Sequence, residues 1–330
     1  MPSVTDMNGA IAIAGSILVD KINEISAYPN AGELTKIKSV TRSVGGCVPN
    51  VAIDIKRVVP NMQVYALGRV GKDEEGAFVQ SELAREGVDV SGLKETDDKT
   101  SFTEVMSVTG GQRTFFTYAG ASATFGFDDF AWDTFPAQML HLGYFLLLDK
   151  VDGGDGLRIL QEAKRRGIKT SIDLVSENAG RYSLVLPCLP YVDNLIINET
   201  EASGLTGIPP TMENLEKIAR KLKEYGVKER VIIHMSEISV CLSESGFSVL
   251  PSYDLPKGFI QGTTGAGDAF CAGCLIGISR GESDENILAL GSVCATGALS
   301  KADAVSGMQE ENQLKKLCKH MERKKVCLSI

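Results

Sequence analysis

The sequence predicts an α/β fold in which helices flank a doubly wound, mainly parallel sheet. Short apolar runs alternate with amphipathic stretches along most of the 330 residues, and glycines close several of those stretches. This alternation is typical of parallel strands joined by crossover helices. One segment instead shows two adjacent strand patterns. We therefore expect a single domain over 1–330 that carries a small inserted β-sheet.

Apolar runs of strand length supply the expected strands of the large sheet. They lie at 10–15, 63–71 (ending as a loop), 139–148, 169–175, 192–198 and 230–235. Other segments have apolar residues at helical spacing, and we expect them to be helices. A glycine follows several of them, as is common at the end of a helix. These lie at 50–59 after Pro49, 74–88, 156–167, 211–226 and 266–279, and two more helices finish the chain.

The alternation breaks between 99 and 118, where "TSFTEVMSVTGGQRTFFTYAG" reads as a hairpin around a glycine-containing turn. We expect this hairpin to combine with residues near 17–40 into a small β-sheet. A β-sheet attached to an α/β body can act as a lid over an active site. The alternative is a β extension with a structural role only.

Composition and charge narrow the class of protein. The net charge of −8 and the pI near 5.1 argue against nucleic acid as a partner. No apolar run approaches the length of a membrane span, and the start of the chain does not resemble a signal peptide. Eight scattered cysteines suggest free thiols in a reducing cytoplasm. Cys271 and Cys274 form a C-x-x-C without a second pair or a nearby histidine cluster, which favours helix packing over metal or redox chemistry.

The stretch "QGTTGAGDAF" (261–270) carries the strongest chemical signal. Gly262 and Gly267 are spaced as in a phosphate loop, but Asp268 stands where such a loop has lysine. Small residues at the start of a helix can hold a phosphate with backbone N–H groups alone. Asp268 would then be free to take a proton from an attacking hydroxyl. The alternative is a tight turn that Asp268 caps.

The motifs resemble the PfkB/ribokinase family of carbohydrate kinases. "TTGAGDAFCAGCL" looks like the C-terminal signature of that family, and other segments that are similar to family motifs occur in the family's order from about residue 10 to 300. These are "AGSILVD" ending at Asp20, "GGCVPNVAIDIKRV" (45–58), "RVGKDEEG" (69–76) and "NETE" (198–201). The resemblance implies a ribokinase-like fold with a β-sheet lid.

The resemblance also implies the catalytic residues. Asp268 would be the base, and the N–H groups of Gly265, Ala266 and Gly267 would form the anion hole. Asn198 and Glu201 would lie near Mg²⁺, acting through water. The residues implied in nucleotide binding are Asn198, Glu201, His234, Ser236, Thr264, Gly265 and Gly267.

Sugar contacts are implied for Asp20, Gly45, Gly46 and Asn50. An aspartate can accept two hydroxyl hydrogen bonds, and paired glycines let a substrate approach the backbone. Arg113, on the predicted lid hairpin, would meet an anionic group of the substrate. A solvated hairpin charge is the alternative for Arg113.

Three segments depart from the family pattern. Gly262 stands where the family usually has aspartate. The missing carboxylate weakens the expectation that this loop binds a monovalent cation. Ser236 and Ser239 replace glycines beside the nucleotide, and "KADAVSG" (301–307) matches poorly near the adenine. The departures raise a second hypothesis, a catalytically weak sugar- or nucleotide-binding regulator on the same fold. A dinucleotide-dependent oxidoreductase is disfavoured because the first strand lacks G-x-G-x-x-G.

Together these observations predict a cytoplasmic kinase that transfers the γ-phosphoryl group of ATP to a primary hydroxyl of a sugar, sugar acid or nucleoside. ATP and Mg²⁺, with K⁺ as a candidate monovalent cation, are the implied cofactors. The implied partners are the small-molecule sugar substrate and ATP, with no nucleic acid and no membrane. In related kinases the lids pair, which implies a homodimer here.

Overall fold

The computed structural model describes residues 9–108, 112–176 and 180–326. The large sheet has the strand order β13-β12-β11-β10-β9-β8-β1-β4-β5, and the strands from β5 to β11 run parallel. β12 and β13 form an antiparallel edge. The strands are β1 Ile11–Gly15, β4 Val64–Gly71, β5 Asp89–Thr96, β8 Met139–Phe145, β9 Lys169–Leu174, β10 Asn194–Asn198, β11 Arg230–His234, β12 Ile238–Ser243 and β13 Gly246–Pro251.

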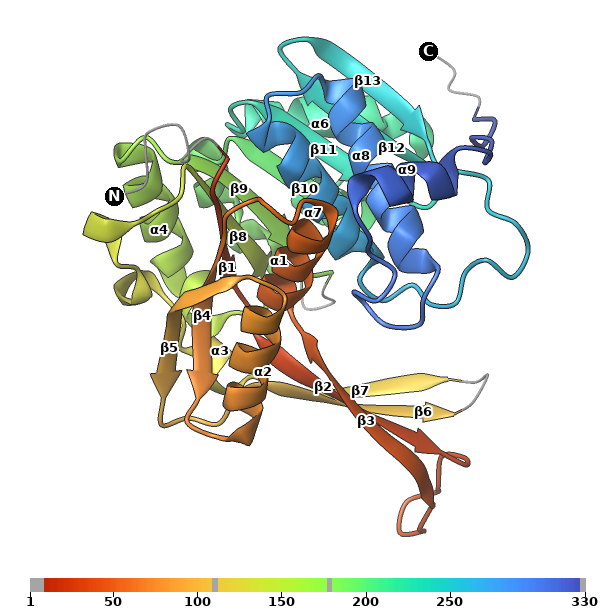
Figure 1. Cartoon of the computed structure of the whole chain (residues 1–330). Coiled ribbons are helices and arrows are strands. Elements are labelled where there is room, and N and C mark those ends of the chain that lie inside the picture. The colour runs from red at the N-terminus through yellow and green to blue at the C-terminus, as the bar shows by residue number, and fades with distance from the viewer. Residues whose placement is uncertain (1–8, 109–111, 177–179, 327–330) are drawn as a thin grey trace.

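Helices cover both faces of this sheet (Figure 1). One core packs α1, α2, α7, α8 and α9 against the sheet, and the other packs α4, α5 and α6. The helices are α1 Cys47–Val58, α2 Glu74–Arg85, α3 Gly120–Ala123, α4 Gly156–Arg165, α5 Glu199–Thr206, α6 Leu215–Glu224, α7 Ala266–Ser279, α8 Asp284–Leu299 and α9 Glu311–Cys318. Two helical layers around a parallel sheet are the predicted doubly wound architecture.

The direction of winding reverses at β1, which pairs with β4 on one side and β8 on the other. In open parallel sheets, ligands bind at the carboxyl ends of the strands next to such a reversal. We therefore expect a site at the carboxyl end of β8 and the loop that follows β1.

A second sheet has the strand order β3-β2-β6-β7 and projects from the body (Figure 1). Its strands are β2 Leu18–Ile25, β3 Ile37–Gly45, β6 Phe102–Val108 and β7 Arg113–Tyr118. The predicted segments 17–40 and 99–118 both contribute, but β3 continues to Gly45 through its pairing with Leu18. Residues 109–111 of the predicted turn lie outside the described residues.

Several predicted boundaries move for local reasons. α1 begins at Cys47, because Pro49 sits in the first helical turn, where its missing N–H is not needed. β4 continues as strand to Gly71, since it pairs with β5, a strand that the sequence reading missed. The predicted helix at 211–226 is a short 3₁₀ turn followed by α6.

Within the described residues, none of the helices combines the length and apolar character that crossing a bilayer requires.

Candidate active site

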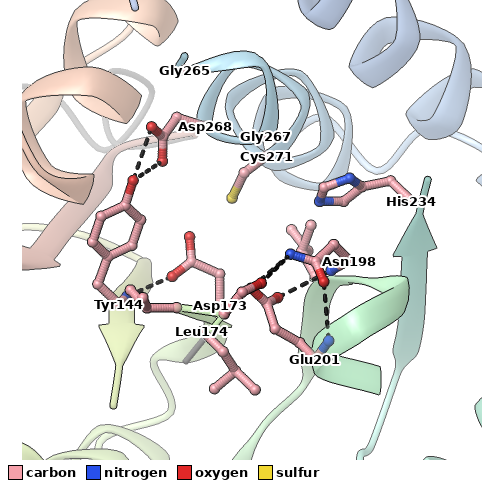
Figure 2. Close-up of a pocket in the computed structure, with 13 residues that line it drawn as sticks. Tyr144, Asp173, Leu174, Asn198, Glu201, His234, Gly265, Gly267, Asp268 and Cys271 are labelled. Atoms are coloured by element: carbon pink, nitrogen blue, oxygen red, sulfur yellow. Dashed lines mark hydrogen bonds between the residues drawn. The ribbon is translucent and has the colours of Figure 1, made fainter. Parts of the chain in front are cut away.

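A cavity of about 350 Å³ lies where the carboxyl ends of β8, β9 and β10 face the start of α7 (Figure 2). Polar and apolar side chains from these elements line it together. The lining residues are Tyr144, Asp173, Leu174, Val175, Ser176, Ile196, Asn198, Glu201, His234, Gly265, Gly267, Asp268 and Cys271. The cavity is thus at the edge of the sheet that the reversal at β1 predicts.

Asp268, in the first turn of α7, is buried in this cavity with 7% of its surface exposed. Its Oδ2 accepts a hydrogen bond from Asn50 Nδ2 at 2.9 Å, and Tyr144 Oη donates to both carboxylate oxygens at 3.0 and 3.1 Å. Burial and the nearby Asp173 charge raise the pKa of Asp268 to about 7, although the two hydrogen bonds oppose that shift. The carboxyl is therefore poised to gain or lose a proton near neutral pH.

The loop before Asp268 brings backbone close to the cavity. Gly265 adopts φ 77°, and a Cβ there would lie 2.6 Å from Ala304 Cα, so only glycine fits. Gly267 borders the cavity, and a Cβ on it would meet only His234 Cε1, at 3.6 Å. The N–H groups of the first turn of α7 have no partner within the helix, and they carry the positive end of its dipole. The start of a helix is a common place for an anion to bind, although here the N–H of Ala266 donates to Thr263 O at 3.4 Å.

Asn198 and Glu201 form the capping box of α5. Asn198 Oδ1 accepts from the N–H of Glu201 at 3.0 Å, while Glu201 Oε2 accepts from the N–H of Asn198 at 3.0 Å. Burial raises the pKa of Glu201 to about 8 against its hydrogen bonds, and the charge of Asp173 adds to the shift. The carboxylate of Glu201 and the amide oxygen of Asn198 are hard oxygen donors, which fits Mg²⁺ with several retained waters.

Asp20 and Gly45 belong to the small sheet, and Gly46 follows as the N-cap residue of α1. Asp20 lies on β2 opposite the end of β3, and a Cβ on Gly45 would sit 2.5 Å from its Oδ2. Burial raises the pKa of Asp20 to about 6, and the Asp20 charge adds to the raised pKa of Asp268. Asn50, on α1, touches Asp268 directly and keeps a buried Oδ1 without a hydrogen-bond partner. Of the predicted sugar residues, Asn50 therefore contacts Asp268, and the charge of Asp20 acts on it.

A larger cavity of about 730 Å³ adjoins the first and shares Asn198, His234 and Gly267 with it. Its lining is more apolar, and serines lie along one side. The apolar contributors are Met235, Leu255, Ile260, Ala266, Phe270, Ala295 and Leu299, and the serines are Ser236, Ser239, Ser252 and Ser292. Two cavities joined at a helix start suit a ligand with a flat apolar part and a charged part.

His234 stands at the junction of the cavities. Its ring packs against Phe270 with centroids 4.8 Å apart, and burial lowers its pKa to about 4. A neutral imidazole can still donate one hydrogen bond to a phosphate.

Six of the predicted residues line neither cavity: Asp20, Gly45, Gly46, Asn50, Arg113 and Thr264. Arg113, the first residue of β7, is exposed and lines neither cavity. Thr264 is exposed as well, and its neighbour Thr263 lines the larger cavity instead. Arg113 would need the small sheet to move before it could meet a ligand in either cavity.

Sequence reasoning missed Tyr144, Asp173 and Lys324. Tyr144 and Asp173 stand at the carboxyl ends of β8 and β9, so the rule for parallel sheets could have found them. Tyr144 also has φ 60°, an uncommon conformation for a non-glycine residue. Lys324 reaches the larger cavity because its N–H donates to Ser252 O at 2.8 Å and its Nζ to Ser236 O at 3.1 Å. No motif marks that lysine.

The departure at Gly262 has a structural reason. A Cβ at this position would lie 2.8 Å from Ala302 O and 2.9 Å from Ala302 Cα. The backbone at 301–302 therefore occupies the space that a side chain at 262 would need. The missing carboxylate at 262 and the poorly matching segment 301–307 are therefore linked, because the two segments pack against each other.

The fold and the joined cavities define the class of protein, a phosphotransferase on a ribokinase-like α/β body. The family model described as pfkB family carbohydrate kinase matches residues 11–311. The chain belongs to the pfkB carbohydrate kinase family, and it is a kinase that acts on an alcohol group. The resemblance noted from the motifs is thereby confirmed.

Known kinases match this chain along most of its length. It is 25% identical over 321 residues to ribokinase from Arabidopsis thaliana, covering 94% of this chain and 81% of that one. It is 27% identical over 286 residues to adenosine kinase from Saccharomyces cerevisiae, covering 84% and 83%. Among solved structures, Arabidopsis thaliana ribokinase complexed with ribose and ATP is similar with TM-score 0.81 and 24% identity, covering 95% and 99%. These matches confirm the predicted fold.

Proposed function

We propose that the protein transfers the γ-phosphoryl group of ATP to a primary hydroxyl of a sugar or sugar acid, with Asp268 as the base. The observation that carries this proposal is the position of Asp268. Its buried carboxyl has a pKa near 7 and lies in the first turn of α7, beside the glycine loop that presents backbone N–H groups. Proton acceptor and anion-binding groups thus share one small cavity.

The chemistry follows from these neighbours. Asp268 in its carboxylate form accepts the proton of the acceptor hydroxyl as the oxygen attacks phosphorus. The N–H groups of Gly265, Ala266 and Gly267 receive charge that develops on the transferred phosphoryl oxygens. Tyr144 and Asn50 hold the carboxylate in position. Mg²⁺, when bound through water near Glu201 and Asn198, would neutralise phosphate charge.

The larger cavity is proposed to hold the nucleotide. Its apolar walls suit an adenine, and its junction with the smaller cavity at Gly267 directs the phosphates toward Asp268. The related Arabidopsis ribokinase structure is a complex with ribose and ATP. Ser236, which stands where the family has glycine, lies beside Lys324 at the larger cavity. The ammonium group of Lys324 would offset phosphate charge there in place of the contacts that glycine backbone makes possible.

The acceptor is proposed to be a polyhydroxylated compound. Asp20 offers two acceptor oxygens, and Asn50 offers an unpartnered buried oxygen next to Asp268. A nucleoside kinase of the same family is the alternative acceptor assignment, supported by the similarity to adenosine kinase. A catalytically weak regulator is the other alternative, and the departures at Gly262, Ser236 and Ser239 motivate it.

The small sheet is proposed to act as a lid and as the contact of a homodimer. Several of its large apolar side chains are exposed, which is unusual for a surface that stays in water. These are Ile37, Val40, Phe115, Phe116 and Tyr118, with Leu34 in the loop between β2 and β3. A second copy of this sheet would cover them, and Arg113 on the same hairpin would move with the lid.

A cytoplasmic location is also proposed, supported by the seven free cysteines among the described residues, all of them buried. Position 262 offers no carboxylate donor to a K⁺ ion, because it is glycine.

A panel of sugars, sugar acids and nucleosides with Mg²⁺-ATP, read by ADP release, tests the proposal. We expect acceptor-dependent release with at least one sugar or sugar acid, and loss of that release in Asp268→Asn. Release with nucleosides alone would favour the nucleoside kinase. Sugar binding by thermal shift without release from any acceptor would favour the regulator.

A further inference from the structure

Four side chains with metal-binding chemistry meet at the wall of the smaller cavity, outside the groups that the phosphoryl-transfer step uses. They are Cys47 at the start of α1, His141 on β8, Asp173 on β9 and Cys271 on α7, and all four are buried. One ligand atom each from Cys47, His141 and Asp173 lies within 4.8 Å of the others.

The distances from His141 Nε2 to its neighbours match those between two ligands of one metal ion. His141 Nε2 is 3.4 Å from Asp173 Oδ2 and 3.6 Å from Cys271 Sγ. Ligands at about 2.0–2.3 Å around a tetrahedral zinc ion are about 3.3–3.8 Å apart. His141 and Asp173 are therefore already at this spacing, and Cys47 lies within 4.8 Å of both.

Neighbouring groups orient the donors as they do around bound metals. His141 Nδ1 is 3.1 Å from Ser171 Oγ, which leaves Nε2 to face the cluster. The N–H of Tyr144 donates to Asp173 Oδ1 at 2.5 Å, which leaves Oδ2 to face it. Such outer hydrogen bonds fix the ring and the carboxylate of metal ligands.

Gly143 makes room for this convergence. A Cβ at that position would lie 1.9 Å from Cys47 Sγ and 3.1 Å from Asp173 Oδ1. Figure 2 shows Asp173 and Cys271 facing the cavity, which gives an ion a route of entry.

We propose that Cys47, His141 and Asp173 bind one borderline divalent metal ion of the Zn²⁺ class, with the fourth position open to the cavity beside Cys271. The mixed sulfur, nitrogen and oxygen donors select such ions, whereas Mg²⁺ takes oxygen ligands. The three donors come from α1, β8 and β9 and are far apart in the sequence, so no short zinc-binding motif marks them. The C-x-x-C of α7 supplies none of the three.

An ion in this site would inhibit phosphoryl transfer, a consequence that rests on the proposed function. Asp173 would be a ligand, and a divalent charge would lie near Asp268, whose pKa already responds to the charge of Asp173. A cation there attracts the carboxylate of Asp268 and competes with the acceptor hydroxyl for it. We expect Zn²⁺ to inhibit turnover and a chelator to restore it.

Cobalt titration of the chelator-treated, untagged full chain tests the binding without any need for turnover. We expect one Co²⁺ per chain with a thiolate-to-cobalt charge-transfer band, displaced by Zn²⁺, and a Zn²⁺-dependent rise in Tm. Cys47→Ser should lose the band. Cys274→Ser should keep it, because Cys274 lies one turn further along α7 and faces the contact with α8, within 3.9 Å of Ile287 O.

Ser171→Ala is the test of the orienting hydrogen bond, and we expect metal affinity to fall about 10–100-fold with the band retained. Circular dichroism melts check that each variant folds. No band in the wild-type chain, or an equal band in a folded Cys47→Ser, would overturn the proposal. If Co²⁺ binds as expected while no acceptor releases ADP, the metal site stands and the kinase assignment fails instead.

Discussion

The two joined cavities differ in how much of their architecture follows the family motifs. The smaller one is lined by Asp268 and Gly265 of the C-terminal motif, and Asn50 of the second motif donates to Asp268. The larger one has serines in place of glycines and a lysine from the C-terminal segment. Groups that must act on a reacting atom tolerate little displacement, whereas a nucleotide can be held by several different sets of contacts. The predictions below test that contrast.

The largest effect is expected from Asp268→Asn. The amide keeps the shape of the side chain but cannot accept the proton of the acceptor hydroxyl, so kcat should fall on the order of 10²–10⁴-fold. Nucleotide affinity, measured by calorimetry, should change little. Turnover near that of the wild type would remove Asp268 from the mechanism.

Tyr144→Phe should have the next largest effect. The phenol donates to both oxygens of Asp268 and lowers its pKa, so removing it should raise that pKa. We expect the rising limb of the pH–rate profile to move up by about one unit, with about tenfold less activity at pH 6.5. An unshifted profile with reduced kcat would mean that Tyr144 positions substrate instead.

Asp20→Ala addresses the acceptor side alone. Loss of two hydroxyl-accepting oxygens should raise KM for the acceptor by roughly tenfold or more, while ATP affinity persists. Equal losses of sugar and ATP binding would indicate misfolding rather than a lost contact.

Lys324→Ala tests the larger cavity. Loss of one partly exposed cation should raise KM for ATP roughly threefold to tenfold and leave kcat unchanged. Lys325→Ala is the matched control, since the neighbouring lysine does not line the cavity. Equal effects of the two variants would show that general charge, not a contact at the cavity, is responsible.

The smallest effect is expected from Asp54→Asn, in stability rather than activity. Asp54 on α1 is fully buried, neither carboxylate oxygen has a hydrogen-bond partner, and burial raises its pKa well above the ordinary value. A raised carboxyl pKa means that stability falls as pH rises from the unfolded pKa near 4 toward the folded pKa. The variant should have a Tm about 2–4 °C higher at pH 8 and nearly unchanged at pH 4. A lower Tm at pH 8 would contradict this account.

The fold and one side of the site could be predicted because their signals are local. The glycine loop and Asp268 are contiguous, and α7 begins at Ala266 as its small residues indicate. Tyr144 and Asp173 were missed because their importance arises only when β8 and β9 are placed side by side. The cluster of Cys47 and His141 needs four elements in contact, and no spacing along the chain reports that.

The pH dependence of kcat/KM for the acceptor tests the central claim most directly, because this parameter reports ionisations of the enzyme form that binds the acceptor. With Mg²⁺-ATP saturating, activity should rise with pH through a midpoint near 7, the pKa of Asp268. The carboxylate is the active form, so activity should be lost below that midpoint. A flat profile from about pH 5.5 to 8.5 would contradict the assignment of Asp268 as a base.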